Sequence, residues 1–169
     1  MNLILYGMMG VGKTSVGMSL AESTGRRWVD TDGLIEKKHG VISEIFRCFG
    51  EEYFRRLETE TVRGLNGLDG LVISVGGGLV LREENVSLLK GNGMMVYLRA
   101  SVQTLEGRLA SDTTRPLLKT GKPLNEHLQE MLQLRAPIYE RVADFTIDTD
   151  GKTVVEIVNE ILSVIDKNK

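Results

Sequence analysis

Very little cysteine is present in this sequence. Among its 169 residues Cys48 is the only cysteine, which excludes an internal disulfide and a cysteine metal cluster. We expect its side chain to pack with Ile45, Phe46 and Phe49. Long apolar runs are absent as well: none approaches the ~20 residues of a membrane span, and the start of the chain lacks the basic flank and small-residue cleavage pattern of a signal peptide. A cytoplasmic protein is therefore expected.

An excess of one charge is also lacking. The chain has 21 Lys and Arg against 23 Asp and Glu, a formal net charge of -2, which gives no reason to expect nucleic acid or an anionic membrane as a partner. Its 41% hydrophobic and 26% charged residues are ordinary for a globular protein. We predict one domain over residues 1–169, large enough to bury a core without disulfide bonds or structural metals. We also expect a monomer.

The motif that dominates the sequence is GMMGVGKT at residues 7–14, which fits the phosphate-binding pattern G-x-x-x-x-G-K-[ST]. It follows an apolar run at residues 3–6, interpreted as a buried strand, and precedes a helical pattern at residues 15–23. Glycines let the loop turn its N–H groups toward one anion, and the start of the helix adds partial positive charge. Lys13 would reach the β- and γ-phosphates, and the Thr14 hydroxyl would hold Mg²⁺.

Two carboxylates, Asp30 and Asp32, lie at the end of a predicted second strand, residues 27–33. Ligands gather at the carboxyl ends of parallel strands, so both acids are expected to face the crevice that holds the phosphate loop. There they would supply the acids that phosphoryl transfer needs. The alternative is that both residues only cap a helix that begins near Gly33.

Residues 34–67 are predicted to be mostly helical, with breaks at Gly40 and Gly50. About forty residues separate the second strand from the next, more than a plain crossover needs, so this insertion is a candidate site for a second substrate. Arg55 and Glu58 lie three residues apart on one helical face, and the acid can orient the guanidinium toward a substrate carboxylate. The alternative is an ordinary surface ion pair.

A buried strand at residues 71–75 ends in the triplet Gly76-Gly77-Gly78. Three consecutive glycines at the carboxyl end of a strand expose bare N–H groups where a ligand can approach closely. A further strand at residues 94–98 and a capped helix at residues 101–110, which carries Arg108, are predicted next.

The segment at residues 111–123 is polar and basic and contains proline and glycine. In an enzyme with a phosphate loop, such a segment can close over the phosphates as a mobile lid and bring Arg115 to them. The alternative is a plain solvated connector.

The last third of the chain is predicted to be a helix, a strand and a helix, at residues 124–135, 145–147 and 154–165. Pro137 is expected to interrupt or kink the first of these helices beside Arg135. The apolar residues of that helix are expected to pack in the core: Leu128, Met131, Leu132 and Leu134.

Six motifs in this order resemble those of the shikimate kinases. They are residues 7–14, Val29-Asp30-Thr31-Asp32, Gly50-Glu51 with Phe54-Arg55 and Glu58, Gly76-Gly77-Gly78, Arg115-Pro116-Leu117-Leu118 and Arg135-Ala136-Pro137-Ile138-Tyr139. The resemblance extends from about residue 3 to residue 149. It implies an α/β fold like that of the nucleoside monophosphate kinases: a three-layer P-loop kinase with a five-stranded parallel sheet, a helical substrate-binding insertion at about 33–67 and a mobile lid at about 111–123.

The resemblance also implies a reaction and a site. Shikimate kinases transfer a phosphoryl group from ATP to the 3-hydroxyl of shikimate with the help of Mg²⁺, a step toward chorismate and the aromatic amino acids. Their ATP site falls here on Gly10, Val11, Gly12, Lys13, Thr14, Ser15, Arg108, Arg115 and Lys152. Their shikimate site falls on Asp32, Arg55, Glu58, Gly76, Gly77, Gly78 and Arg135. Thr14 and, through water, Asp30 would hold the metal, and the catalytic groups would be Lys13, Asp32 and Arg115.

Other functions are compatible with parts of this sequence. A gluconate-type or nucleoside monophosphate kinase could share the fold, but two converging arginines and a glycine triplet favour a small polyhydroxy acid over a nucleotide base. A nucleotide switch or a non-catalytic nucleotide-binding module is a further alternative. A GTPase switch needs an N-K-x-D motif, and the only Asn-Lys pair is at residues 168–169; an inactive module should have lost Lys13, Asp32 or Arg115, and all three are present.

Overall fold

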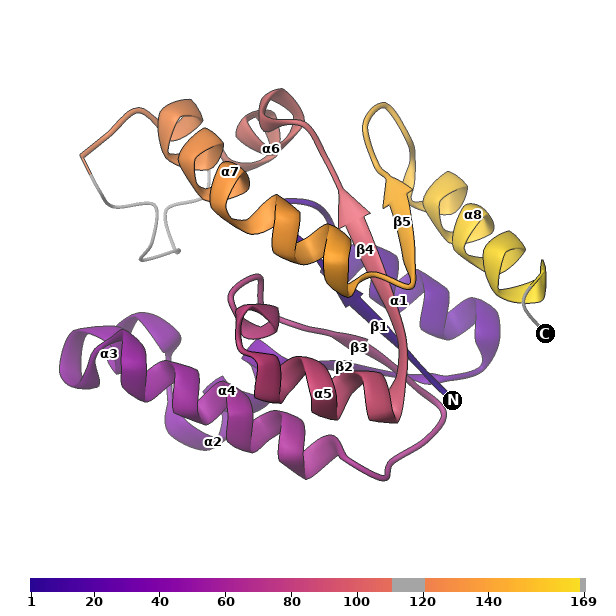
Figure 1. The fold of residues 1–169 in the computed structure, drawn as a ribbon, viewed down its shortest axis with the longest axis horizontal. Helices are drawn as coiled ribbons and strands as arrows, with labels where there is room; N and C mark the ends of the chain where they lie inside the picture. Colours follow the sequence, from indigo (N-terminus) through magenta and orange to yellow (C-terminus); the bar gives the residue numbers. More distant parts are fainter. Residues whose placement is uncertain (111–120, 168–169) are drawn as a thin grey trace.

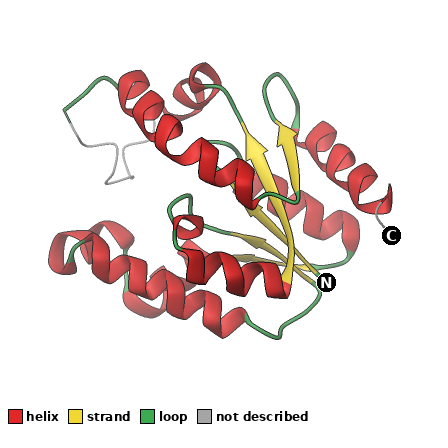
Figure 2. Cartoon of the chain, viewed as in Figure 1, coloured by secondary structure: helices red, strands yellow, loops and turns green. Residues whose placement is uncertain are grey.

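A central sheet of parallel strands organises the computed structural model, which describes residues 1–110 and 121–167 (Figures 1 and 2). The five strands lie in the order β2-β3-β1-β4-β5, and every neighbouring pair is parallel, which confirms the predicted sheet. The strands are β1 (Asn2–Tyr6), β2 (Arg27–Asp30), β3 (Leu71–Ser74), β4 (Gly93–Arg99) and β5 (Phe145–Asp148).

Helices cover both faces of this sheet. In Figure 1, α1 and α8 lie on one face and α5 and α7 on the other, so the molecule has three layers. None of the helices in the described ranges is both long and apolar enough to span a bilayer. The helices are α1 (Lys13–Thr24), α2 (Thr31–His39), α3 (Ile42–Phe49), α4 (Glu51–Leu65), the short 3₁₀ helix η1 (Leu79–Leu81), α5 (Glu83–Asn92), α6 (Val102–Leu109), α7 (Leu124–Val142) and α8 (Val154–Lys167).

The central strand β1 explains where a ligand site must form. All five of its residues are buried, as expected for a strand covered by helices on both faces. The chain passes from β1 to β2 on one side of the sheet and later reaches β4 on the other side. The carboxyl end of β1 is therefore a topological switch point, the place where open α/β sheets leave a crevice for ligands.

The helices between β2 and β3 form a lobe of their own beside the sheet (Figure 1). Helices α2 and α3 end at Gly40 and Gly50, whose φ angles of 92° and 83° favour glycine. Both predicted breaks are thus where the sequence indicated. A small apolar cluster holds these helices together: Ile35, Ile45, Phe54 and Leu57.

The second strand is shorter than predicted. It ends at Asp30, which becomes the residue before α2, and Asp32 lies in the first turn of that helix. The prediction of a strand through residue 33 was wrong, because the carboxylate of Asp32 stabilises the positive amino end of a helix more than it suits a strand.

Helix α7 is longer than predicted, since it continues through Pro137 to Val142. A proline inside a helix removes one backbone hydrogen bond and costs about 3 kcal/mol. Tyr139 and Val142, both buried on the sheet beyond the proline, offset that cost. The predicted interruption at Pro137 was therefore wrong.

Three side chains predicted to pack inside lie at the surface. Leu134 on α7 is 77% exposed and Phe49 at the end of α3 is 63% exposed, while Cys48 is exposed as well. Each belongs to a helix whose opposite face is buried, at Leu128 in α7 and at Ile45 in α3. Helical spacing alone did not identify the buried face.

Candidate active site

The loop between β1 and α1 has the shape that its glycines predict. Gly10 has a φ of 79°, and Gly12, directly before α1, has a φ of 101°; both values lie in the left-handed region. The Lys13 ammonium donates hydrogen bonds of 3.0 Å to the carbonyl oxygens of Gly7 and Met8. A positive charge is thus held over the loop, at the amino end of a helix whose first turn contains no acid.

A pocket of about 610 Å³ opens beside this loop at the carboxyl ends of the strands. Its walls come from the phosphate loop, β3, the lobe of α2 to α4, and α7. The predicted residues that line it are Lys13, Thr14, Asp30, Asp32, Arg55, Glu58, Gly76, Gly77, Gly78 and Arg135. Residues from four separate segments therefore meet at one cavity.

Four carboxylates line the pocket, at Asp30, Asp32, Glu36 and Glu58. Burial raises the pKa of Asp30, while nearby backbone N–H groups and the charge of Lys13 oppose the rise. Burial also raises the pKa of Glu58, to about 7, against the opposing charge of Arg55 and with a small addition from the charge of Asp32. Asp32 and Glu58 both lie next to Gly76, each with one oxygen 3.0 Å from where a Cβ on that glycine would stand.

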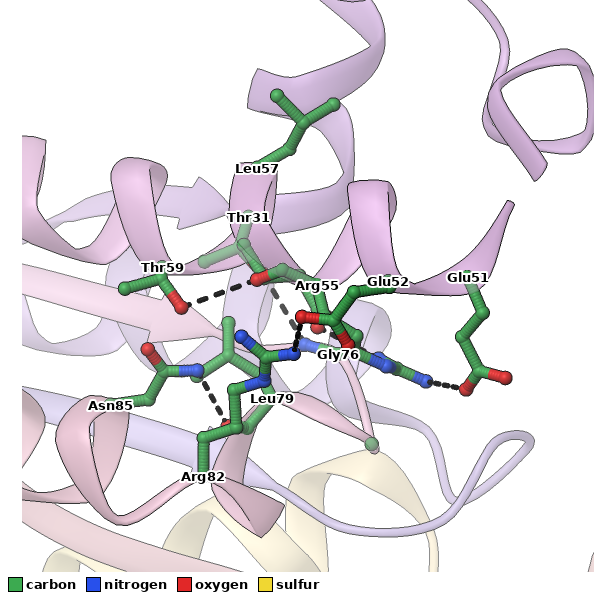
Figure 3. A network of polar contacts seen from close by, with 12 residues as sticks. Thr31, Glu51, Glu52, Arg55, Leu57, Thr59, Gly76, Leu79, Arg82 and Asn85 are labelled. Atoms are coloured by element: carbon green, nitrogen blue, oxygen red, sulfur yellow. Dashed lines mark hydrogen bonds and ion pairs between the residues drawn. The ribbon is translucent and has the colours of Figure 1, made fainter. Parts of the chain in front are cut away.

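Arg55 is held from two sides by acids of its own helix, and its contact with Glu51 is drawn in Figure 3. Its Nη1 donates to Glu58 Oε2 at 2.7 Å, and its Nη2 donates to Glu51 Oε1 at 3.1 Å. The Arg55 side chain is only 11% exposed and that of Glu58 only 1%. The alternative of an ordinary surface pair is therefore excluded for Arg55 and Glu58, since a buried partner fixes the guanidinium far better than an exposed one.

The glycine triplet is the point where these groups converge. A Cβ on Gly77 would lie 3.3 Å from Arg135 Nη1, and one on Gly78 would lie 2.5 Å from Arg55 Cζ. The Gly78 backbone has φ -85° and ψ -14°, which any residue adopts. The glycine at position 78 is thus required by the space that the Arg55 guanidinium occupies and not by the backbone.

Of the predicted nucleotide residues, Lys13 and Thr14 line this pocket, while Gly10, Val11, Gly12, Ser15, Arg108 and Lys152 are not part of its lining. Arg108 lies against the phosphate loop, where its Nη1 donates to the carbonyl oxygen of Val11 at 2.9 Å. Lys152 forms an ion pair with Glu160. Arg115 and most of the predicted lid are outside the described residues, so their roles stay predictions.

The donor set suits Mg²⁺ bound through a nucleotide. In the described ranges no group of three or more His, Cys, Asp or Glu side chains could hold a metal by itself. Mg²⁺ prefers oxygen ligands and usually keeps waters and substrate phosphates, so a complete protein cage is not required. The Thr14 hydroxyl and the Asp30 carboxylate line the same cavity as Lys13 and fit that requirement.

Several residues that shape the pocket were not predicted as site residues. Thr31 Oγ1 accepts a hydrogen bond of 3.3 Å from the N–H of Gly76 (Figure 3), and Ser74 Oγ donates one of 3.0 Å to the carbonyl oxygen of Lys13. Phe46 and Phe54 form an apolar wall. Thr31, Phe54 and Tyr139 belong to the motifs of the sequence, but no role at the site was predicted for them. Short polar residues at strand ends were the available signal for Thr31 and Ser74.

A phosphate loop at the switch point of a parallel sheet, with an acceptor pocket that holds two arginines and several acids, defines a P-loop kinase that acts on a small molecule. The shikimate kinase family model matches residues 9–166, and the chain belongs to the shikimate kinase family.

Curated relatives and solved structures agree with this assignment. The chain is 46% identical to a shikimate kinase of Thermodesulfovibrio yellowstonii over 95% of this chain and 92% of that protein. It is 42% identical to a shikimate kinase of Geobacter sulfurreducens, over 97% of this chain and 90% of that protein. The structure of shikimate kinase from Acinetobacter baumannii in complex with shikimate is 38% identical and superposes with a TM-score of 0.95 over 99% of this chain and 94% of that one.

Proposed function

We propose that the protein transfers the γ-phosphoryl group of ATP to the 3-hydroxyl of shikimate, giving ADP and shikimate 3-phosphate. The observation that carries this proposal is the convergence of Arg55 and Arg135 on the glycine triplet, in the same cavity as the phosphate-loop residues Lys13 and Thr14. A carboxylate on the acceptor is the group that two guanidinium forks suit best.

The nucleotide would bind along the phosphate loop. The N–H groups at the start of α1, from Gly10 to Ser15, would cradle its phosphates, and Lys13 would exchange its present carbonyl partners for phosphate oxygens. Mg²⁺ held by Thr14 and, through water, by Asp30 would neutralise charge on the β- and γ-phosphates. Arg108 would act indirectly, by holding the carbonyl of Val11 in the loop.

Shikimate would lie across the pocket with its carboxylate between Arg55 and Arg135 and its ring hydroxyls toward Asp32 and Gly77. The 3-hydroxyl oxygen attacks the γ-phosphorus while the bond from that phosphorus to the β–γ bridging oxygen breaks. The hydroxyl proton passes to Asp32 or is oriented by it. Because the transition state is loose, most of the rate enhancement comes from positioning and charge neutralisation by the residues around the two substrates.

The direct test is ADP release from MgATP by the purified protein, with shikimate, gluconate or AMP as acceptor. We expect turnover with shikimate that exceeds turnover with the other acceptors by several orders of magnitude, since neither gluconate nor AMP matches both the arginine pair and the acids. Preferred turnover with gluconate or AMP would reassign the acceptor, and no turnover with any acceptor would point to the non-catalytic module.

Gly78→Ala is expected to raise the KM for shikimate at least tenfold. The added methyl group would overlap the Arg55 guanidinium and force it away from its 2.7 Å contact with Glu58. The free energy of unfolding should also fall: the backbone at Gly78 is compatible with alanine, but the displaced guanidinium leaves the buried Glu58 carboxylate without its closest partner.

Gly64→Ala is the matched control for this variant. Gly64 lies on the same helix as Arg55, and a Cβ there meets nothing within 4 Å. The KM of Gly64→Ala for shikimate should equal that of the wild type. The variant should be slightly more stable, because alanine is a better helix former than glycine. Equal KM values for all three proteins would show that Arg55 does not contact the acceptor.

A further inference from the structure

Tyr139 is a buried tyrosine with two specific polar contacts. Its hydroxyl donates a hydrogen bond of 2.6 Å to the carbonyl oxygen of Gly77, and its own backbone carbonyl accepts one of 2.7 Å from the hydroxyl of Tyr6. Burial raises the pKa of Tyr139, so the phenol stays protonated and able to donate. Through these contacts helix α7 is tied both to the glycine triplet and to the central strand.

The ring of Tyr139 is held by two other tyrosines. It packs against Tyr6 and Tyr97, with ring centroids 5.7 and 5.2 Å away, and these two rings stack on each other at 5.6 Å. All three side chains are at most 1% exposed. A ring packed on two sides has little freedom, so its hydroxyl points in one fixed direction.

That hydroxyl determines the direction in which the peptide group between Gly77 and Gly78 points. In a trans peptide the carbonyl of one residue and the N–H of the next point in opposite directions, so the bond from Tyr139 to the Gly77 carbonyl also orients the N–H of Gly78. The N–H of Gly76 binds Thr31, whereas those of Gly77 and Gly78 make no hydrogen bond within the described part of the chain. Three glycines in a row would otherwise be the most flexible backbone in the pocket.

The same hydroxyl lies beside one of the two arginines. A Cβ on Gly77 would stand 3.2 Å from Tyr139 Oη and 3.3 Å from Arg135 Nη1. The phenol and the guanidinium therefore meet on one side of Gly77. Arg135 and Tyr139 are one helical turn apart on α7, so each constrains the other.

We propose that Tyr139 is a positioning residue for the acceptor: it fixes the Gly77–Gly78 peptide and Arg135 together, so that backbone N–H groups and a guanidinium meet shikimate in one arrangement. This inference rests on the proposed function. It assigns to the tyrosine a role in acceptor binding and none in binding the nucleotide, because its hydroxyl meets Gly77 and Arg135 while its ring packs on Tyr6 and Tyr97.

Tyr139→Phe tests the proposal, since it keeps the ring and removes only the hydroxyl. We expect the KM for shikimate to rise by about five- to twentyfold, the KM for MgATP to stay within about twofold, and kcat to fall less than the KM for shikimate rises. Calorimetric titration with shikimate alone should show the same loss of affinity.

Tyr6→Phe is the matched control, because it also removes one buried hydrogen bond from the same cluster without touching Gly77 or Arg135. The two variants should lose similar stability, measured as Tm, but only Tyr139→Phe should change the KM for shikimate. If both variants change KM equally, or if neither does, Tyr139 has only a structural role. If the wild type shows no turnover with shikimate, the proposed function fails instead, and the two failures are distinguishable.

Discussion

Asp32→Asn is expected to lower kcat by about two to three orders of magnitude, while the KM for MgATP stays within about threefold. The carboxylate lies in the first turn of α2, lines the pocket and stands near Glu58 and Gly76, so we expect it to act on the acceptor hydroxyl and not on the nucleotide. Asparagine has the same shape but is a poor proton acceptor and lacks the charge that orients the hydroxyl. The loss should therefore appear in turnover.

Steady-state kinetics with each substrate varied in turn measures this effect. Asp69→Asn is a suitable control, because it removes the same charge from an exposed acid at the opposite end of the sheet and should leave both constants unchanged. An equal loss of turnover and of ATP affinity in Asp32→Asn would contradict the assignment and place this acid at the nucleotide.

The parallel sheet and the phosphate loop could be predicted because their signals are local. Residues 3–6 and 71–75 are apolar runs without alternation, which indicates strands buried on both faces. The phosphate-loop pattern at residues 7–14 predicts the turn from the first of these strands to α1. The order of the strands was not predicted from the residues alone. Pairing joins segments far apart in the chain, such as Leu3 with Val72, and no local pattern records that choice.

The sequence predicts a feature of the site best where a residue type has a single structural use, as glycine has at points of close approach. The glycine triplet indicated close approach, and in the structure Gly76, Gly77 and Gly78 each face groups that a side chain would displace. Arg108 shows the opposite case. An arginine on a surface helix gives no sign of which acceptor it will reach: Arg108 donates to the carbonyl oxygen of Val11, and its role at the nucleotide stays a prediction.

Tyr139 was overlooked as a functional candidate for a related reason. Its position depends on α7 continuing past Pro137, which the proline made improbable from sequence alone. Only the packed helix places its hydroxyl on Gly77, 62 residues away in the chain. Contacts between distant segments that depend on the direction of a single polar atom are the part of a site that local patterns cannot supply.

Arg135→Ala is expected to raise the KM for shikimate by about ten- to a hundredfold, with a smaller change in kcat. A charge-assisted contact to a partly buried carboxylate contributes roughly 1.5 to 3 kcal/mol, which corresponds to that range. The KM of Arg135→Lys for shikimate should lie between those of the wild type and Arg135→Ala, because lysine keeps the charge but loses the planar fork. Arg141→Ala removes an exposed arginine from the same helix, outside the residues that line the pocket, and should behave as the wild type.

Comparison with Arg55→Ala separates binding from folding. Removing Arg55 also leaves the carboxylate of Glu58, 1% exposed, without its closest partner, so this variant should lose both shikimate affinity and Tm. Arg135 carries no such buried acid on its own helix, and the loss in its variant should be confined to affinity.

If both arginines bind one carboxylate, the double variant will lose less affinity than the sum of the two single losses. Once either arginine is gone, the remaining one can no longer hold the acceptor in the productive pose. Unchanged KM values in both single variants would remove these arginines from the acceptor site.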